Sequence, residues 1–337
     1  MRNDFLVYYI MEGIELKFVQ TVLGKVPINK IGKTDSHEHL IRIGGGEVIH
    51  GGNDFLMDSV DNAEKEISLY KNAGGDTIVE MTPCGSGRDI NSLIKLSEIS
   101  NINIIATTGF HKSELYDRTH FLYRYSTEDI ADLLIKDIEE GIDEYDYAGP
   151  IVRRSKGKAG VIKAAASYQV ITEIEKKELK AAGIASVKTG FPVSLHLERG
   201  TMALEAVEIL LQTGVRPDNI ILGHIDRNPD LLYHKKIASK GVYLIYDGPG
   251  RIKYYTDEVI SNLFKNMENE GFGSQILIGG DLGRRSYFKS YGGGPGLDYN
   301  LNTFVPRLLE IGLSETSVRN ICCENARNAF SNKIYEI

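Results

Sequence analysis

Two histidines spaced one residue apart, His37 and His39, lie in the segment KTDSHEH near residue 35. Because side chains alternate along a strand, both rings would project to the same side, about 7 Å apart along the chain. Imidazole nitrogens are common ligands of divalent metal ions. Such a pair also arises by chance in unrelated proteins, so it predicts a metal site only in the company of other ligands.

Further candidate ligands occur within or at the ends of later apolar runs. His196 lies in VSLHLE, His224 in ILGHID and Asp281 in ILIGGDLG. Burying an unpaired imidazole or carboxylate is costly, and a metal ion would satisfy either group. Each histidine taken alone could instead be a core residue bonded to a backbone carbonyl. We interpret the three residues together as metal ligands.

Lys163 lies among valine, isoleucine and alanine in GVIKAAAS, where a lysine cannot easily stay charged. Two interpretations are open. The ammonium could pair with a buried carboxylate such as Asp281. Alternatively, the neutral amine could react with carbon dioxide to give a carbamate, which is an anionic ligand able to bridge two metal ions.

These residues belong to short runs rich in valine, isoleucine and alanine, each followed by a segment with helical spacing. Eight such units predict an α/β protein with a closed (β/α)8 TIM barrel, whose chemistry lies at the carboxyl ends of the strands. An open, doubly wound sheet is disfavoured because no GxGxxG sequence follows the first strand. The first strand is KTDSHEH, and the others start near residues 76, 103, 160, 192, 220, 241 and 276.

The composition excludes several classes of partner. A net charge of -7 gives no reason to expect binding to nucleic acid or to an anionic membrane. The three cysteines, Cys84 and the adjacent Cys322 and Cys323, cannot form a disulfide framework, so the cytoplasm is the expected location. A small-molecule substrate is the expected partner, and a homodimer is left open.

We expect one domain overall. Residues 1–30 are predicted to form a β-rich extension packed on the barrel, and residues 31–337 the barrel that carries the candidate metal ligands. The apolar run FLVYYIM at residues 5–11 is too short to span a bilayer. It also lacks the small-residue cleavage site of a signal peptide, so we interpret it as a β-rich segment covering the barrel bottom.

The order of the candidate ligands along the chain resembles the amidohydrolase superfamily. The strings GVIKAA, LHLERG and ILGHID resemble its phosphotriesterase-like branch, and the similarity extends from about residue 30 over nearly the whole chain. This resemblance implies a hydrolase with two divalent metal ions, zinc by default and manganese or cobalt as alternatives. It implies that one ion is held by His37, His39 and Asp281, the other by His196 and His224, and that Lys163, carboxylated by carbon dioxide, bridges them with a hydroxide.

The expected reaction is hydrolysis, in which the hydroxide attacks a carbonyl carbon. Asp281 would take the proton and pass it to the leaving oxygen, so Asp281 and Lys163 are the predicted catalytic residues. Asp226, two residues after His224, could orient this transfer from behind the ligands. It could equally be a surface carboxylate that caps the next helix.

The loops that would follow the last two strands are basic, and such loops often bind phosphate in this fold. The first carries Arg251 and Lys253, and the second carries Arg284, Arg285, Tyr287 and Lys289. A guanidinium, an ammonium and a phenol hydroxyl could hold a phosphate beside the metals, whereas the alternative is a solvated charged loop.

Within the phosphotriesterase-like branch, Lys253, Arg284 and Tyr287 resemble the pattern of enzymes that open 1,4-lactones of phosphorylated five-carbon sugar acids. The expected substrate is therefore a pentono-1,4-lactone 5-phosphate. One alternative is a lactonase, esterase or phosphotriesterase for unphosphorylated substrates. An alternative of another class is a catalytically silent barrel that binds a phosphorylated metabolite.

Overall fold

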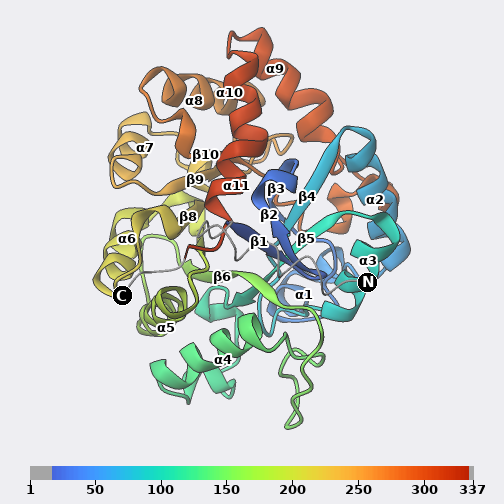
Figure 1. The fold of residues 1–337 in the computed structure, drawn as a ribbon, viewed down its shortest axis with the longest axis vertical. Helices are drawn as coiled ribbons and strands as arrows, with labels where there is room; N and C mark the ends of the chain where they lie inside the picture. The colour runs from blue at the N-terminus through green and yellow to red at the C-terminus, as the bar shows by residue number, and fades with distance from the viewer. Residues whose placement is uncertain (1–16, 334–337) are drawn as a thin grey trace, which may run out of the picture.

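The computed structural model describes residues 17–333, which are built around one eight-stranded parallel sheet (Figure 1). The strands follow one another in chain order, each paired with the next, as expected when every strand is returned to the sheet by a helix. They are β3 (Lys33–Glu38), β4 (Gly75–Glu80), β5 (Asn103–Gly109), β6 (Ala159–Ala166), β7 (Val193–Leu197), β8 (Ile220–Gly223), β9 (Tyr243–Tyr246) and β10 (Ile276–Ile278).

The sheet curls until its first and last strands meet. The backbone amides of Gly280 and Asp281, just after β10, donate hydrogen bonds of 3.2 and 2.7 Å to the carbonyl oxygen of His37 in β3. The predicted (β/α)8 barrel is therefore confirmed. β10 is shorter than predicted because Gly279 and Gly280 pass so close to β3 that a Cβ on Gly280 would lie 1.9 Å from a carboxylate oxygen of Glu38.

Helices surround the strands, as Figure 1 shows. The predicted segments form helices with the expected end signals: Ser126 and Asp129 make a reciprocal capping box before α4, and Gly190, with φ of 77°, ends α5. The helices are α1 (Gly46–Gly51), α2 (Val60–Asn72), α3 (Ile90–Ser100), α4 (Thr127–Glu139), α5 (Glu173–Thr189), α6 (Ala203–Gln212), α7 (Leu231–Ala238), α8 (Asp257–Asn269), α9 (Val305–Glu310), α10 (Glu315–Arg319) and α11 (Asn325–Ala329).

A hairpin of β1 (Phe18–Thr21) and β2 (Gly24–Pro27) covers the amino ends of the barrel strands. The amide of Val22 donates to the carbonyl oxygen of Ile104 at 2.9 Å. The side-chain amide of Gln20 donates to the carbonyl oxygen of Ala159 at 2.6 Å. This antiparallel sheet confirms a β-rich N-terminal extension. The run at residues 5–11 lies outside the described residues, and the limits 1–30 and 31–337 stay predictions.

The barrel interior is an apolar layer that separates the hairpin from the opposite mouth. Val79, Val161 and Leu277 from different strands are fully buried in one cluster with Val19 of the hairpin and Phe330 near the C-terminus. Alternating strand residues fill the barrel in this way, so it is a packed core and not a pore. The polar residues at the carboxyl ends of the strands therefore stand on a rigid base.

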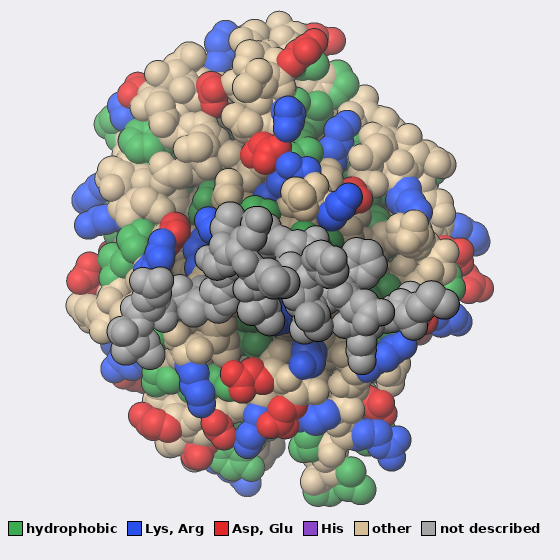
Figure 2. Space-filling model, viewed as in Figure 1, with side chains coloured by type: hydrophobic (Ala, Val, Ile, Leu, Met, Phe, Trp, Pro, Cys, Tyr) green, Lys and Arg blue, Asp and Glu red, His purple; other side chains and the backbone are tan. Residues whose placement is uncertain are grey.

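On the face shown in Figure 2, lysine and arginine side chains are interspersed with aspartate and glutamate. Within residues 17–333, no helix is long and apolar enough to cross a membrane. The cytoplasmic location and the homodimer stay predictions from the sequence.

Candidate metal centre

The histidines of the first barrel strand converge on one aspartate. His37 lies in β3 and His39 directly follows it; their Nε2 atoms lie 3.7 and 3.5 Å from Oδ1 of Asp281. The Nδ1 atom of each ring has a different neighbour, which forms a hydrogen bond only with His39. Nδ1 of His39 is 2.8 Å from the hydroxyl of Thr82, and Nδ1 of His37 is 3.4 Å from Oδ2 of Asp247. Partners on Nδ1 orient a ring so that Nε2 can bind a metal ion.

A second pair of histidines stands on the neighbouring strands. Nδ1 of His196, in β7, lies 2.7 Å from Nε2 of His224, which follows β8. A carboxylate holds the outer nitrogen of each ring: Asp247 is 2.9 Å from Nδ1 of His224, and Glu198 is 3.1 Å from Nε2 of His196. Histidine ligands of metal ions are commonly backed by carboxylates in this arrangement.

Lys163 extends from β6 toward the same place and is 2% exposed. Its amine donates a 2.9 Å hydrogen bond to the carbonyl oxygen of Met81. Burial lowers the pKa of Lys163 to about 8, although the charge of Asp281 opposes this shift. A neutral amine, the form that reacts with carbon dioxide, is therefore accessible near neutral pH.

The donor set fits a metal ion. His37, His224 and Asp281 each offer a ligand atom, and these atoms lie within 4.8 Å of one another. Nε2 of His37 is buried and has no hydrogen-bond partner among the described residues, which is costly unless something binds it. Burial also holds the pKa of His37 and His224 well below the usual value, so both rings are neutral, as metal ligands must be.

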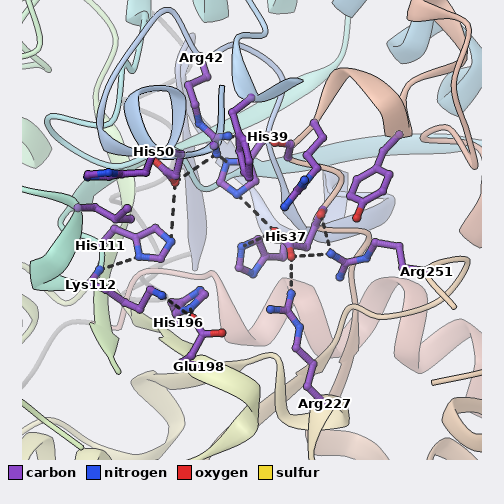
Figure 3. Close-up of a pocket in the computed structure, with 18 of the residues that line it drawn as sticks. His37, His39, Arg42, His50, His111, Lys112, His196, Glu198, Arg227 and Arg251 are labelled. Atoms are coloured by element: carbon purple, nitrogen blue, oxygen red, sulfur yellow. Dashed lines mark hydrogen bonds and ion pairs between the residues drawn. The ribbon is translucent and has the colours of Figure 1, made fainter. Parts of the chain in front are cut away.

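Two arginines contact Asp281: Arg227, which sequence reasoning missed, and Arg251, which it placed only in a basic loop that could bind phosphate. Arg251 donates from Nη1 to Oδ2 of Asp281 at 2.8 Å and to its carbonyl oxygen at 3.0 Å, and Arg227 donates to the same Oδ2 (Figure 3). Burial alone would raise the pKa of Asp281, but Arg251, His224 and Arg227 hold it well below its usual range. The one sequence signal for Arg227 is its position directly after the segment HID, which contains the candidate ligand His224.

Asp247 is a further residue that sequence reasoning missed. Its carboxylate contacts both His37 and His224, and Arg251 also donates to its backbone carbonyl oxygen. Asp247 ends the apolar run GVYLIYD in the same way that Asp281 follows ILIGG. The rule that selected Asp281 could therefore have selected Asp247 as well.

Asp226 is buried, so the interpretation as a surface cap is wrong; Asp230 caps α7 instead. One carboxylate oxygen of Asp226 accepts a 2.7 Å hydrogen bond from the amide of Gly248, and the other has no partner among the residues described. Burial, with the charge of Asp247, raises the pKa of Asp226 to about 7. The carboxylate seen to orient His224 is that of Asp247.

A pocket of about 400 Å³ opens beside these residues at the carboxyl ends of the strands. Lys253, Arg284 and Tyr287 line it. The amine of Lys253 lies 5.5 Å from the centre of the Tyr287 ring, and Arg284 lies over the ring of Phe55 at 4.1 Å. The side chains of these three predicted phosphate-binding residues make no hydrogen bond with any residue between 17 and 333; Arg284 has only a 3.6 Å contact with Asp54.

The other basic residues of the last loop face elsewhere. Arg285 pairs with Asp58 at 2.7 Å and Lys289 pairs with Asp298 at 2.6 Å, and neither lines the pocket. Lys253, Arg284 and Tyr287 thus line the pocket without side-chain hydrogen bonds to the described residues. Arg285 and Lys289 lie outside it and are neutralised by carboxylates. His111 and His50 also line the pocket.

Enzymes with a (β/α)8 barrel have their active sites at the carboxyl ends of the strands. The cluster of histidines and acidic residues lies at that end of this barrel. The chain is a member of the phosphotriesterase family, whose model matches residues 17–330. The resemblance noted in the sequence is therefore confirmed.

Individual relatives agree with this assignment. The chain is 41% identical to a phospho-furanose lactonase of Mycoplasmopsis agalactiae, over 92% of this chain and 90% of that protein. It is 40% identical to a phospho-furanose lactonase of Mycoplasmopsis synoviae, over 94% and 93%. A crystal structure of a lactonase from Listeria monocytogenes has a TM-score of 0.88 and 30% identity, and the match covers 94% of this chain and 99% of that one.

Proposed function

We propose that the chain is a metal-dependent lactonase that opens pentono-1,4-lactones carrying a 5-phosphate. One observation carries the proposal: a single pocket is lined both by the histidine and aspartate cluster and by the unpaired donors of Lys253, Arg284 and Tyr287. A small molecule with an ester and a phosphate a few bonds apart would reach both. The names of relatives about 40% identical over more than nine tenths of the chain point to the same substrate class.

The donor set of imidazoles and carboxylates suits zinc, with manganese or cobalt as alternatives. Two divalent ions bound here would supply a nucleophilic hydroxide near neutral pH and polarise the ester carbonyl. In this proposal His37, His39 and Asp281 hold one ion, His196 and His224 hold the other, and Lys163, as a carbamate, is shared by both.

The remaining residues bind and orient the substrate. Arg284 offers a planar pair of donors to two phosphate oxygens, while Lys253 and Tyr287 add an ammonium and a hydroxyl. Lys253 and Tyr287 have no competing hydrogen bonds within the described chain, and Arg284 has only its 3.6 Å contact with Asp54, so a phosphate does not have to displace a hydrogen bond. Anchoring the phosphate fixes the ester at the histidine cluster, which lowers the entropic cost of reaction.

Asp281 is proposed to accept the proton of the attacking hydroxide and to deliver it to the ring oxygen as the ester bond breaks. Arg251 and Arg227 keep its carboxylate ionised, as a proton acceptor must be, and fix its position. Asp247 holds His37 and His224 in position during this transfer. Lys163 and Asp281 thus remain the residues to which we assign catalytic roles.

A hydrolysis screen with matched pairs of lactones, with and without the 5-phosphate, tests the proposal. We expect kcat/KM to be about 100-fold higher or more for the phosphorylated member, because two charge-assisted hydrogen bonds are worth about 3 kcal/mol or more. Equal turnover of the two members would contradict it. Preference for the unphosphorylated member would favour a lactonase or esterase without a phosphate site.

A further inference from the structure

Glu47 is an acidic residue of the pocket to which the proposed function assigns no role. It lies in the first turn of α1, lines the pocket, and its side chain is 10% exposed. Gly46 holds this turn against the loop after β5: a Cβ on Gly46 would lie 2.2 Å from the carbonyl oxygen of Leu115. The position of Glu47 is therefore set by close backbone packing.

The carboxylate of Glu47 has cations nearby but no hydrogen bond. Its Oε1 lies 3.5 Å from Nη2 of Arg42 and 3.8 Å from Nε2 of His111, which are too long for hydrogen bonds. Nη1 of Arg42 instead donates to the carbonyl oxygen of Gly283 at 3.0 Å, and its Nη2 lies 3.2 Å from Nδ1 of His39. Within residues 17–333 no group donates a hydrogen bond to Glu47, and its Oε2 is buried without a partner.

The other carboxylates that line the pocket are satisfied. Glu198 accepts from Lys112 at 2.7 Å and lies 3.1 Å from Nε2 of His196, and Asp281 accepts from Arg251. Among the described acidic residues of the pocket, Glu47 is thus the one with unused acceptor capacity. A buried acceptor without a donor costs free energy unless a ligand supplies the donor.

The charge of Glu47 decides which part of a substrate it can meet. A carboxylate repels a phosphate, which must therefore bind away from it, at Lys253, Arg284 and Tyr287. Hydroxyl groups donate readily to a carboxylate. The ring of His111, next to Glu47, lies 4.3 Å from that of His196, so a ligand held at the histidine cluster is within reach of this side of the pocket.

We propose that Glu47 is a specificity-determining residue that accepts a hydrogen bond from a ring hydroxyl of the substrate. This inference rests on the proposed function, because it takes the substrate to be a hydroxylated lactone phosphate. Glu47 then selects hydroxylated lactones over deoxy lactones, while the phosphate donors select phosphorylated over free ones. A site built to bond a hydroxyl discriminates strongly against the analogue that lacks it, because its polar group is left unpaired.

The test combines a change in the substrate with a change in the protein. Hydrolysis of a pentono-1,4-lactone 5-phosphate and of its 2-deoxy and 3-deoxy analogues is measured for the metal-loaded wild-type protein and for Glu47→Gln. Glu98→Gln is the control, since Glu98 also pairs with one cation, Lys156, but on the exposed surface. The wild type should lose about 10- to 100-fold in kcat/KM on at least one deoxy analogue, as expected for a hydrogen bond to a charged group.

Glu47→Gln should lose a similar factor on the hydroxylated lactone but change less than about twofold on that deoxy analogue, with Glu98→Gln unchanged on all three substrates. Equal losses on every substrate, or no loss, would overturn the role of Glu47 while the lactonase proposal stands. No hydrolysis of any phosphorylated lactone by the wild type would overturn both. If Glu47→Gln does not fold, equal rates of the wild type on all three substrates would still refute the inference.

Discussion

Asp281 is a residue with two kinds of partner on one carboxylate. Its Oδ1 faces the Nε2 atoms of His37 and His39, while its Oδ2 accepts from Arg227 and Arg251. Asp281 also adopts a left-handed backbone conformation, with φ of 47°. Such a conformation costs free energy and persists where surrounding contacts impose it. The two arginines therefore set the position of the carboxylate that the proposed metal ion requires.

Replacing Arg251 tests this position. Arg251→Met removes the hydrogen bonds to both backbone and side chain of Asp281 and leaves a largely buried carboxylate less well paired. We expect the free energy of unfolding of the metal-free protein to fall by about 3 kcal/mol. Urea denaturation measures this. Arg285→Met, which breaks a more exposed pair with Asp58, should change it by less than about 0.5 kcal/mol; equal effects of both variants would refute the assignment.

The proposed phosphate donors make a prediction of their own. Lys253→Ala and Arg284→Ala should each raise KM for a phosphorylated lactone by about tenfold or more, since each removes a charge-assisted hydrogen bond. Neither should change kcat/KM for the unphosphorylated lactone by more than about twofold. Steady-state kinetics on both substrates measure this, and Lys289→Ala serves as the control because Lys289 pairs with Asp298 outside the pocket. An unchanged KM in both variants would exclude these residues from the phosphate site.

At the scale of single elements, α5 buries an acid that has no partner. Glu178 is 1% exposed, and neither of its carboxylate oxygens has a hydrogen bond among the residues described. Burial, reinforced by the charge of Glu175, raises its pKa well above the usual value. The folded protein therefore keeps this proton at pH values where the unfolded chain has lost it.

This difference in protonation makes the stability of the protein depend on pH. Because the folded state binds the extra proton, the stabilising contribution of Glu178 is full below the unfolded pKa, near 4.3, and is lost as pH rises toward the folded pKa. We therefore compare the free energies of unfolding of the wild type and of Glu178→Gln. The value for the wild type minus the value for the variant should fall from pH 5 to pH 8. Urea denaturation at both pH values measures it.

Glu173→Gln on the same helix is the matched control. Glu173 is largely exposed and pairs with Lys176, so its variant should differ from the wild type by the same amount at both pH values. A difference for Glu178→Gln that does not change with pH would show that Glu178 does not hold a proton in the folded state.

On the scale of the whole molecule, the candidate ligands connect distant parts of the barrel wall. They come from β3, β6 and β7 and from the segments that follow β8 and β10. Two metal ions held by these residues, with Lys163 shared between them, would tie strands from opposite sides of the barrel. Ligands that bind only the folded state stabilise it in proportion to the logarithm of their concentration over Kd.

Removal of metal should therefore destabilise the whole barrel. We expect chelation to lower Tm by about 5–10 °C, and added zinc to restore it. Differential scanning calorimetry with metal analysis measures both. Lys163→Met, which lacks one proposed ligand, should show a smaller decrease. An unchanged Tm after chelation, together with less than one bound ion per chain, would contradict the metal centre.

Much of the fold could be predicted from local patterns. Eight apolar runs alternating with helical segments predicted the barrel, because strands buried on both faces must be apolar and parallel neighbours need helical crossovers. The six candidate ligands could be selected because polar residues within or at the end of such runs are costly to bury without a function. β10 ended earlier than predicted, since the close approach of Gly280 to Glu38 depends on barrel closure.

The sequence by itself determined which residue types stand at the strand ends, and hence the class of chemistry. Only the tertiary structure decided their partners: Asp247 between His37 and His224, and Arg227 and Arg251 on Asp281. His224 and Asp247 are 23 residues apart in the chain, and Arg227 and Asp281 are 54 apart. Their contacts arise because barrel closure brings the loops after different strands to one mouth, and no local pattern encodes which side chains then meet.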